Sequence, residues 1–108
     1  MNKKYIIRKN EEIEKIIKFN HKYANKYFVI YYNENNLNFN RFCISISKKI
    51  GKAYIRNYYK RVMKDILSKN NINTSYDYVI ILRNAILDLS YNNIKESILE
   101  LLRGEKYE

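Results

Sequence analysis

The sequence predicts a small α/β (α+β) two-layer sandwich, in which helices pack on a central sheet of three or four strands. Three segments have apolar residues at helical spacing, two are rich in β-branched and aromatic residues, and one alternates between apolar and polar positions. Their order along the chain is helix, strand, strand, helix, strand, helix (α-β-β-α-β-α). The 108 residues contain no proline, no low-complexity linker and no internal repeat, so we expect one domain over residues 1–108.

The first predicted helix covers residues 11–20. Asn10 is a suitable N-cap for it, because an asparagine side chain can accept a hydrogen bond from the first turn. Glu11 and Glu12 then lie where the positive end of the helix dipole favours acids. The apolar stripe of this helix consists of three isoleucines, Ile13, Ile16 and Ile17.

Two strands are predicted next, paired with each other as a hairpin. Residues 27–32 (YFVIYY) are β-branched or aromatic throughout. The segment 39–47 then alternates, and the apolar positions of one face are Phe42, Ile44 and Ile46. The opposite face has Arg41, Cys43, Ser45 and Ser47, so we expect a half-exposed strand. The polar residues 33–38 between the two strands suit a turn.

The second half of the chain contains two more predicted helices on either side of one strand. A helix beginning at Ala53 fades over residues 68–71, and residues 76–83 (YDYVIILR) are apolar enough for a central strand. Ser90 is positioned to cap the last helix, and Gly104 to end it. One face of that helix contains five apolar residues, Tyr91, Ile94, Ile98, Leu101 and Leu102.

The net charge limits the classes of partner. With 21 Lys and Arg against 11 Asp and Glu, the formal charge is +10 and the isoelectric point is about 9.6. Such a charge opposes compaction, so we expect an anionic partner, either nucleic acid or an anionic membrane surface. AT-rich codon usage explains the abundance of lysine, asparagine, isoleucine and tyrosine. It does not explain why cations cluster on one face of a helix.

Cellular location and redox chemistry are predicted from what the sequence lacks. Its apolar runs are shorter than the roughly 18 residues that span a bilayer, and the first ten residues contain no hydrophobic region of signal-peptide length. Cys43 is the only cysteine, so neither a disulfide framework nor a cysteine metal site is expected. We therefore expect a cytoplasmic protein.

Residues 48–64 (KKIGKAYIRNYYKRVMK) are the most informative part of the chain. On a helix drawn from Ala53 at about 100° per residue, apolar side chains share one face: Ile55, Tyr59, Val62, Met63 and Ile66. The other face gathers cations and one amide without an acid: Arg56, Asn57, Lys60, Arg61 and Lys64. Three lysines precede the helix around Gly51: Lys48, Lys49 and Lys52. A core-packed helix that turns cations outward is typical of nucleic-acid binding.

Each residue type in this segment suits contact with a phosphate backbone. Arginine forks match phosphate oxygens or a guanine edge, and lysines release counterions on binding. Backbone N–H groups at the start of the helix can also bind a phosphate. Gly51 permits either a close approach or a positive φ. Asn57 suits a 2′-hydroxyl or base contact, or else a hydrogen bond that holds an arginine in place.

The motif Lys48-Lys49-x-Gly51-x-Ala53-x-x-Arg56-Asn57-x-x-Lys60-Arg61 resembles the signature of the bacterial ribonuclease P protein subunit. The resemblance extends to Asn10-Glu11-Glu12, to Ala24-Asn25 and to the serine-bearing strand before Lys48, so it covers nearly the whole chain. It implies the family's left-handed strand–helix–strand crossover. It also implies a protein subunit of ribonuclease P, an endonuclease whose catalytic RNA removes the 5′ leader from precursor tRNA.

The resemblance implies two RNA-binding surfaces. The basic helix and the loop before it would contact the catalytic RNA, through Lys48, Lys49, Arg56, Asn57, Lys60 and Arg61. Lys52 and Lys64 extend the same basic surface by their position. A cleft between the first helix and the sheet would hold the leader, at Lys9, Ile13, Ile17, Val29 and Tyr31. The implied partners are the catalytic RNA and precursor tRNA, with no membrane and no small-molecule substrate.

Two features depart from the family pattern. Tyr58 stands where the family usually has arginine, and its ring either stacks on a base or ribose or covers the edge of the core. Ile13 and Ile17 stand where phenylalanines are common, which keeps an apolar wall but removes ring stacking. Leader binding would then depend more on Tyr31, Lys9 and backbone contacts.

The chain offers no residues to which we assign catalysis. His21, the only histidine, lies in a polar run after the first helix, and the three aspartates are scattered along the sequence. Metal sites for hydrolysis usually need several converging carboxylates or histidines. We therefore expect Mg²⁺ to be bound mainly by the partner RNA, with none held by the protein alone.

Two other functional classes remain open. A general RNA-binding module, such as a ribosomal protein, would bind RNA tightly without affecting the cleavage of precursor tRNA. A membrane-surface protein would use a basic amphipathic helix with bulky Leu, Phe or Trp on its apolar face. The chain has Ile55, Val62 and Ile66 there, which suit a protein core.

Overall fold

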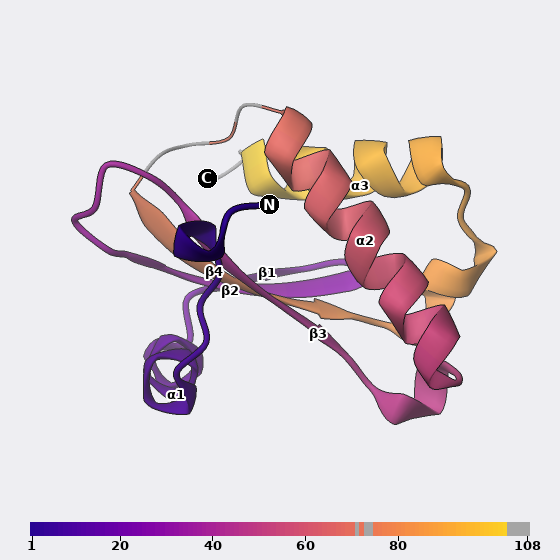
Figure 1. Ribbon diagram of the computed structural model, residues 1–108, viewed down its shortest axis with the longest axis horizontal. Coiled ribbons are helices and arrows are strands. Elements are labelled where there is room, and N and C mark those ends of the chain that lie inside the picture. Colours follow the sequence, from indigo (N-terminus) through magenta and orange to yellow (C-terminus); the bar gives the residue numbers. More distant parts are fainter. Residues whose placement is uncertain (71, 73–74, 104–108) are drawn as a thin grey trace.

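The computed structural model describes residues 1–70, 72 and 75–103, and it confirms the predicted fold class (Figure 1). Its described helices are α1 (Asn10–Phe19), α2 (Ala53–Lys69) and α3 (Tyr91–Arg103), with 3₁₀ helices η1 (Lys3–Tyr5), η2 (Lys48–Ile50) and η3 (Asn84–Asp88). The strands are β1 (Lys22–Ala24), β2 (Phe28–Glu34), β3 (Arg41–Ile46) and β4 (Tyr76–Leu82). Helices α2 and α3 cover one face of the sheet, and α1 crosses the other face (Figure 1).

The strand order is β1-β2-β4-β3, so the predicted hairpin between β2 and β3 is wrong. β4 lies between them, antiparallel to β2 and parallel to β3. The alternation in β3 identified the residues that face the core, but periodicity contains no information about which strand is the neighbour. The central position of β4 was predicted correctly, whereas the three-residue β1 was too short and polar to be recognised.

Helix α2 connects β3 to β4 by a left-handed crossover. In Figure 1, β3 lies nearest the viewer with β4 behind it, both run from left to right, and α2 passes above them. Nearly all crossovers between parallel strands have the opposite hand. The resemblance to a known family predicted this handedness, which no feature of the residue pattern indicates.

The main core lies between the sheet and helices α2 and α3. On α2 the predicted stripe is buried at Tyr59, Val62, Met63 and Ile66, and Ile55 is half-buried against it. On α3 the buried residues are Ile94, Ile98, Leu99 and Leu102, whereas Tyr91 is exposed and Leu101 half-buried. The predicted cap is confirmed, because the Ser90 hydroxyl accepts a hydrogen bond from the Asn93 amide at 3.3 Å. Gly104, the predicted helix stop, lies outside the described residues.

A second, smaller core lies under α1. Its buried residues are Ile7, Ile16 and Val79, joined by the half-buried Ile13, Tyr31, Cys43 and Ile81. The helix begins one residue earlier than predicted, so Asn10 is helical and the N-cap position belongs to Lys9, which makes no side-chain cap bond. The Lys9 carbonyl accepts the amides of Glu12 and Ile13, both at 3.1 Å, and this adds Asn10 to the first turn.

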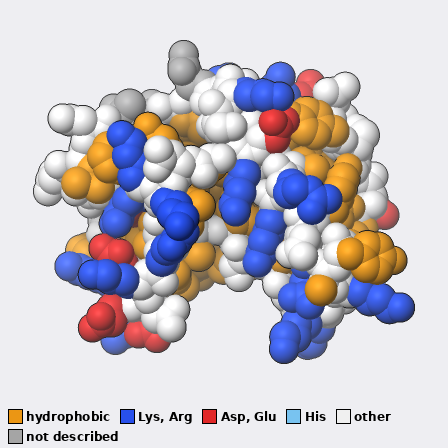
Figure 2. Space-filling view, in the orientation of Figure 1, with side chains coloured by type: hydrophobic (Ala, Val, Ile, Leu, Met, Phe, Trp, Pro, Cys, Tyr) orange, Lys and Arg blue, Asp and Glu red, His pale blue; other side chains and the backbone are white. Residues whose placement is uncertain are grey.

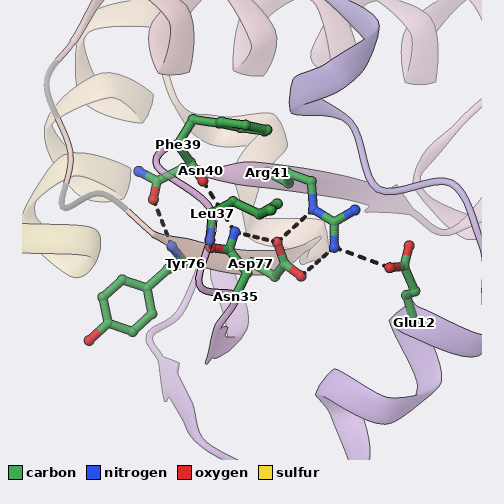
Figure 3. Close-up of polar contacts among 8 residues, drawn as sticks. All are labelled: Glu12, Asn35, Leu37, Phe39, Asn40, Arg41, Tyr76 and Asp77. Carbon is green, nitrogen blue, oxygen red and sulfur yellow. Dashed lines mark hydrogen bonds and ion pairs between the residues drawn. The ribbon is translucent and has the colours of Figure 1, made fainter.

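A partly buried polar cluster links α1 to the sheet (Figure 3). Arg41 on β3 donates to both carboxylate oxygens of Asp77 on β4, at 2.9 and 2.7 Å, and to Glu12 on α1 at 3.2 Å. Asp77 is only 7% exposed, and the side-chain amide of Asn35 also donates to it at 2.8 Å. The polar face predicted for β3 is therefore partly covered by α1. Arg41 forms ion pairs with carboxylates of two other elements, α1 and β4.

We predict that breaking this cluster on one side destabilises the fold strongly. Arg41→Ala leaves the Asp77 carboxylate buried without its main partner, which should lower the free energy of unfolding by about 3 kcal/mol. The double variant Arg41→Met/Asp77→Leu should lose less than the sum of the two single variants, measured by urea unfolding. Lys69→Met, which removes an exposed ion pair with Asp65, is the control and should leave stability nearly unchanged. Equal losses for Arg41→Ala and the control would contradict the prediction.

Candidate nucleic-acid interface

The loop before α2 holds Lys48 and Lys49 outward. The Ser47 hydroxyl accepts a hydrogen bond from the Lys49 amide at 3.1 Å, and the Ile50 amide donates to the Ser47 carbonyl at 3.0 Å, which closes η2. The Ile50 side chain is buried and anchors this turn to the main core. The two lysines are therefore exposed on a fixed turn rather than on a free loop.

Gly51 allows a close approach rather than a special backbone conformation. Its φ of 164° is extended backbone that any residue adopts. A Cβ at this position would lie 3.0 Å from Ile55 Cδ1, so the Ile55 side chain packs where another residue would need space. The Arg56 Nε atom donates to the Gly51 carbonyl at 3.1 Å. Arg56 thus connects the first turn of α2 to the loop and is half-buried.

All eight basic and amide residues predicted to bind RNA lie along η2, the following loop and one side of α2. Lys48, Lys49, Lys52, Asn57 and Arg61 are exposed, whereas Arg56, Lys60 and Lys64 are half-buried. Figure 2 shows the corresponding Lys and Arg side chains spread over α2 and the turn below it. None of the ion pairs found among the described residues involves these cations.

The acid on α2, Asp65, is already paired with partners outside this surface. Asp65 accepts a hydrogen bond from the Tyr91 hydroxyl at 2.6 Å and forms an ion pair with Lys69 at 3.0 Å. Both contacts lower the pKa of the Asp65 carboxyl, so it stays ionised and occupied by its own partners. The cations of α2 therefore keep their charge for an external anion.

The cleft predicted for the leader is a half-covered part of the sheet. On the face toward α1, the strand register aligns Tyr31, Val79 and Cys43 in one row and Val29, Ile81 and Ser45 in the next. Val79 is buried under α1, but Val29 and Ile81 are half-buried and Ser45 is exposed. Figure 2 shows the molecule hollowed along this lower side, between α1 and the beginning of α2.

The structure brings most of the predicted leader-binding residues to this hollow. Glu12 and Ile17 lie on opposite flanks of α1, and Glu12 reaches Arg41, so Ile17 faces the open part of the sheet. Ile17 is 36% exposed, whereas Ile13 packs mainly into the smaller core. Val29 and Tyr31 are half-buried in the sheet, and Lys9 is exposed at the start of α1.

Three further residues of the cleft were missed from the sequence. Ile81 and Ser45 extend its floor, and they could be found only once β3 and β4 were known to be neighbours. Lys22 lies on β1, with Nζ 5.8 Å from the centre of the Tyr31 ring, and adds a cation beside the cleft. Its strand was not predicted, so nothing in the sequence placed it opposite Tyr31.

The cleft and the basic surface meet at β3, which is one of the two edge strands. Burial raises the pKa of the Cys43 thiol on this strand, and the positive charge of Lys60 partly offsets the effect. Ser45, on the floor of the cleft, lies three residues before Lys48, because β3 runs directly into η2. The two surfaces predicted separately therefore adjoin at the end of β3.

Other kinds of site find little support in the part of the chain that the structure describes. No three or more His, Cys, Asp or Glu residues gather there as metal ligands would. His21 contacts the rings of Phe19 and Tyr32, at centroid distances of 5.7 and 5.8 Å. No described helix is both long enough and apolar enough to cross a membrane.

Comparison with known proteins gives the family. The family model described as Ribonuclease P matches residues 1–105. The chain belongs to the ribonuclease P protein family. The ribonuclease P protein component of Alkaliphilus oremlandii is 40% identical over 99 residues, which cover 90% of this chain and 87% of that protein. Ribonuclease P membership makes this chain an RNA-binding protein of bacterial tRNA processing.

Solved ribonuclease P proteins have the same fold. A Staphylococcus aureus RNase P protein, a mutant with defective mRNA degradation activity, superposes with a TM-score of 0.87 at 33% identity, covering 94% of this chain and 87% of that one. The RNase P protein from Thermotoga maritima gives a TM-score of 0.86 at 27% identity, covering 93% and 96%. The strand order and crossover described above are therefore those of the family.

We predict that the two arginines of the ribonuclease P motif differ in their effect on stability. Arg61→Ala should leave the free energy of unfolding unchanged, because its side chain is exposed. Arg56→Ala should lower it by about 1 kcal/mol, because the hydrogen bond to the Gly51 carbonyl is lost. Both variants should bind RNA more weakly, and each should reduce the slope of log affinity against log salt by about one. Thermal unfolding and filter binding check this, and equal stability of the two variants would contradict it.

Proposed function

We propose that this protein is the subunit of ribonuclease P that binds the catalytic RNA through η2, the Gly51 loop and α2, and holds the 5′ leader of precursor tRNA in the cleft beside α1. The observation that supports this most directly is that the two surfaces adjoin where β3 runs into η2. A single RNA complex can contact the cations of α2 and present a single strand to the sheet at the same time.

Electrostatics supports the contact with the catalytic RNA. The predicted residues Lys48, Lys49, Lys52, Arg56, Asn57, Lys60, Arg61 and Lys64 contribute seven charges that form no internal ion pair among the described residues. Each phosphate they neutralise releases counterions, so binding should weaken steeply with salt, by about 10³-fold or more between 50 and 200 mM if roughly six cations engage phosphates. The fixed turn at η2 lowers the entropy lost when its lysines bind.

The shape and composition of the cleft suit a single-stranded leader. Ile17, Val29 and Ile81 offer an apolar wall, and Tyr31 supplies the ring that the isoleucines of α1 lack. Lys9 and Lys22 provide positive charge for the backbone of the strand. Stacking and backbone contacts of this kind tolerate many sequences, as a leader-binding subunit requires.

We infer that the protein assists cleavage without performing it. The carboxylates that the fold brings together, Glu12 and Asp77, are bound to Arg41 and do not fit a magnesium site. Mg²⁺, which would neutralise phosphate charge and activate water, is therefore assigned to the RNA. The protein's own residues would bind, orient and neutralise the two RNA molecules.

The test is cleavage of precursor tRNA at low magnesium, comparing catalytic RNA alone, protein alone and the mixture. We expect correct 5′ maturation with the mixture and little with either component alone. The reason is that cations of the protein neutralise RNA phosphates that Mg²⁺ would otherwise have to neutralise. Cleavage by the protein alone would contradict the non-catalytic role. RNA binding without any gain in cleavage would assign the chain to the general RNA-binding class.

We predict that Tyr31 distinguishes substrates with and without a leader. In the reconstituted complex, Tyr31→Leu should weaken binding of precursor tRNA by about fivefold or more, because one stacking contact is lost. Binding of mature tRNA should not change, and Tyr31→Phe should recover most of the affinity. Tyr27→Leu, at a half-buried tyrosine that packs against the main core and not under α1, is the matched control. A parallel loss for precursor and mature tRNA would show that Tyr31 acts through the fold and not through the leader.

A further inference from the structure

The flank of α2 that faces away from β3 carries a second kind of surface. Tyr54, Asn57, Tyr58 and Arg61 occupy positions i, i+3, i+4 and i+7, so their side chains adjoin one another. Tyr54 is 71% exposed and Tyr58 is 48% exposed. Exposed hydrophobic side chains stand beside Lys and Arg over the first half of α2, on the right of Figure 2. Two neighbouring exposed rings next to an arginine need an explanation that core packing does not give.

These four residues line a pocket of about 480 Å³ together with Ile55 and Tyr59. Tyr59 is buried and seals the core beneath, so Tyr58 is not required as a cover. The Tyr58 ring lies nearly perpendicular to that of Tyr59, with centroids 5.1 Å apart and an interplanar angle of 80°. This contact fixes the orientation of Tyr58 while about half of its surface stays in solvent. The pocket volume lies within the range of small-ligand sites.

We propose that this pocket, the Tyr54–Tyr58 pocket, binds an unpaired nucleobase of the catalytic RNA; the proposal rests on the function proposed above. Tyrosine rings stack on the π-face of any base. Asn57 has both a donor and an acceptor for a base edge, and Arg61 can bind the adjoining phosphate. The function of Tyr58 is thus stacking, the first of the two alternatives that its sequence position left open.

Charge and position favour RNA over a protein occupant. The pocket adjoins the basic surface of α2 and shares Asn57 and Arg61 with it. An RNA bound to that surface can therefore place a neighbouring nucleotide directly in the pocket. A second copy of this chain would bring another net charge of +10 against the same surface and be repelled. A base in the pocket adds contacts that do not depend on salt, unlike the phosphate contacts around it.

The experiment measures binding of the cognate catalytic RNA by the full-length protein over a series of salt concentrations. Tyr54→Leu and Tyr58→Leu should each reduce affinity at every salt concentration, by about 5- to 150-fold for a fully stacked base. The slope of log affinity against log salt should stay that of wild type, because no charge is removed. The phenylalanine counterparts keep the ring and should recover most of the loss. Arg61→Gln should instead reduce the slope by about one.

Controls separate this proposal from the function on which it rests. Phe19→Leu replaces an exposed ring on α1, across the sheet, and should bind the RNA as wild type does. Wild type that fails to bind the RNA would contradict the proposed function itself. Wild-type binding with unchanged affinity in both leucine variants would overturn only the pocket. An affinity loss that is matched by a fall in thermal stability would also overturn the pocket. The same holds if wild type is a dimer that the leucine substitutions dissociate without changing RNA affinity.

Discussion

Parallel pairing of β3 with β4 is the constraint on which the arrangement of this protein depends. Parallel neighbours cannot be joined by a tight turn, so the chain must travel back along the sheet between them, and α2 makes that return. Because β3 is an edge strand, the return packs the basic helix against one side of the sheet, next to β3. The same pairing places Arg41 next to Asp77, where the ion pair holds α1 and defines the cleft. Both candidate RNA surfaces thus follow from one pairing of strands.

Arg41 and the cations of the basic surface have different roles. Arg41 is enclosed by Glu12 and Asp77, and its charge serves the fold. The lysines and arginines from η2 to the middle of α2 have no carboxylate within ion-pair distance among the described residues. Their mutual repulsion costs stability and is relieved only by an external anion. These cations are therefore placed where an external anion can neutralise them.

Local patterns in the sequence predicted local structure well and pairing poorly. The spacing of Tyr59, Val62 and Ile66 identified the buried face of α2, because helix periodicity follows directly from residue order. Alternation in β3 gave its faces correctly but could not name β4 as its partner, which depends on contacts distant in sequence. Lys22 and Ile81 were missed in the cleft for the same reason. The hydrogen bond from Arg56 to Gly51 depends on a side-chain rotamer that residue type alone does not fix.

The half-buried thiol on the sheet gives the cleft a chemical property as well as a shape. Disulfide formation and oxidation proceed through the thiolate, and burial keeps the pKa of Cys43 above its ordinary value. At neutral pH the sulfur is therefore mostly protonated and a poor nucleophile, despite the lysine nearby. Since this is the single cysteine of the chain, it has no second cysteine in the same molecule with which to form a disulfide. The thiol thus adds a small, weakly nucleophilic group to the floor of the proposed cleft, where it serves packing rather than chemistry.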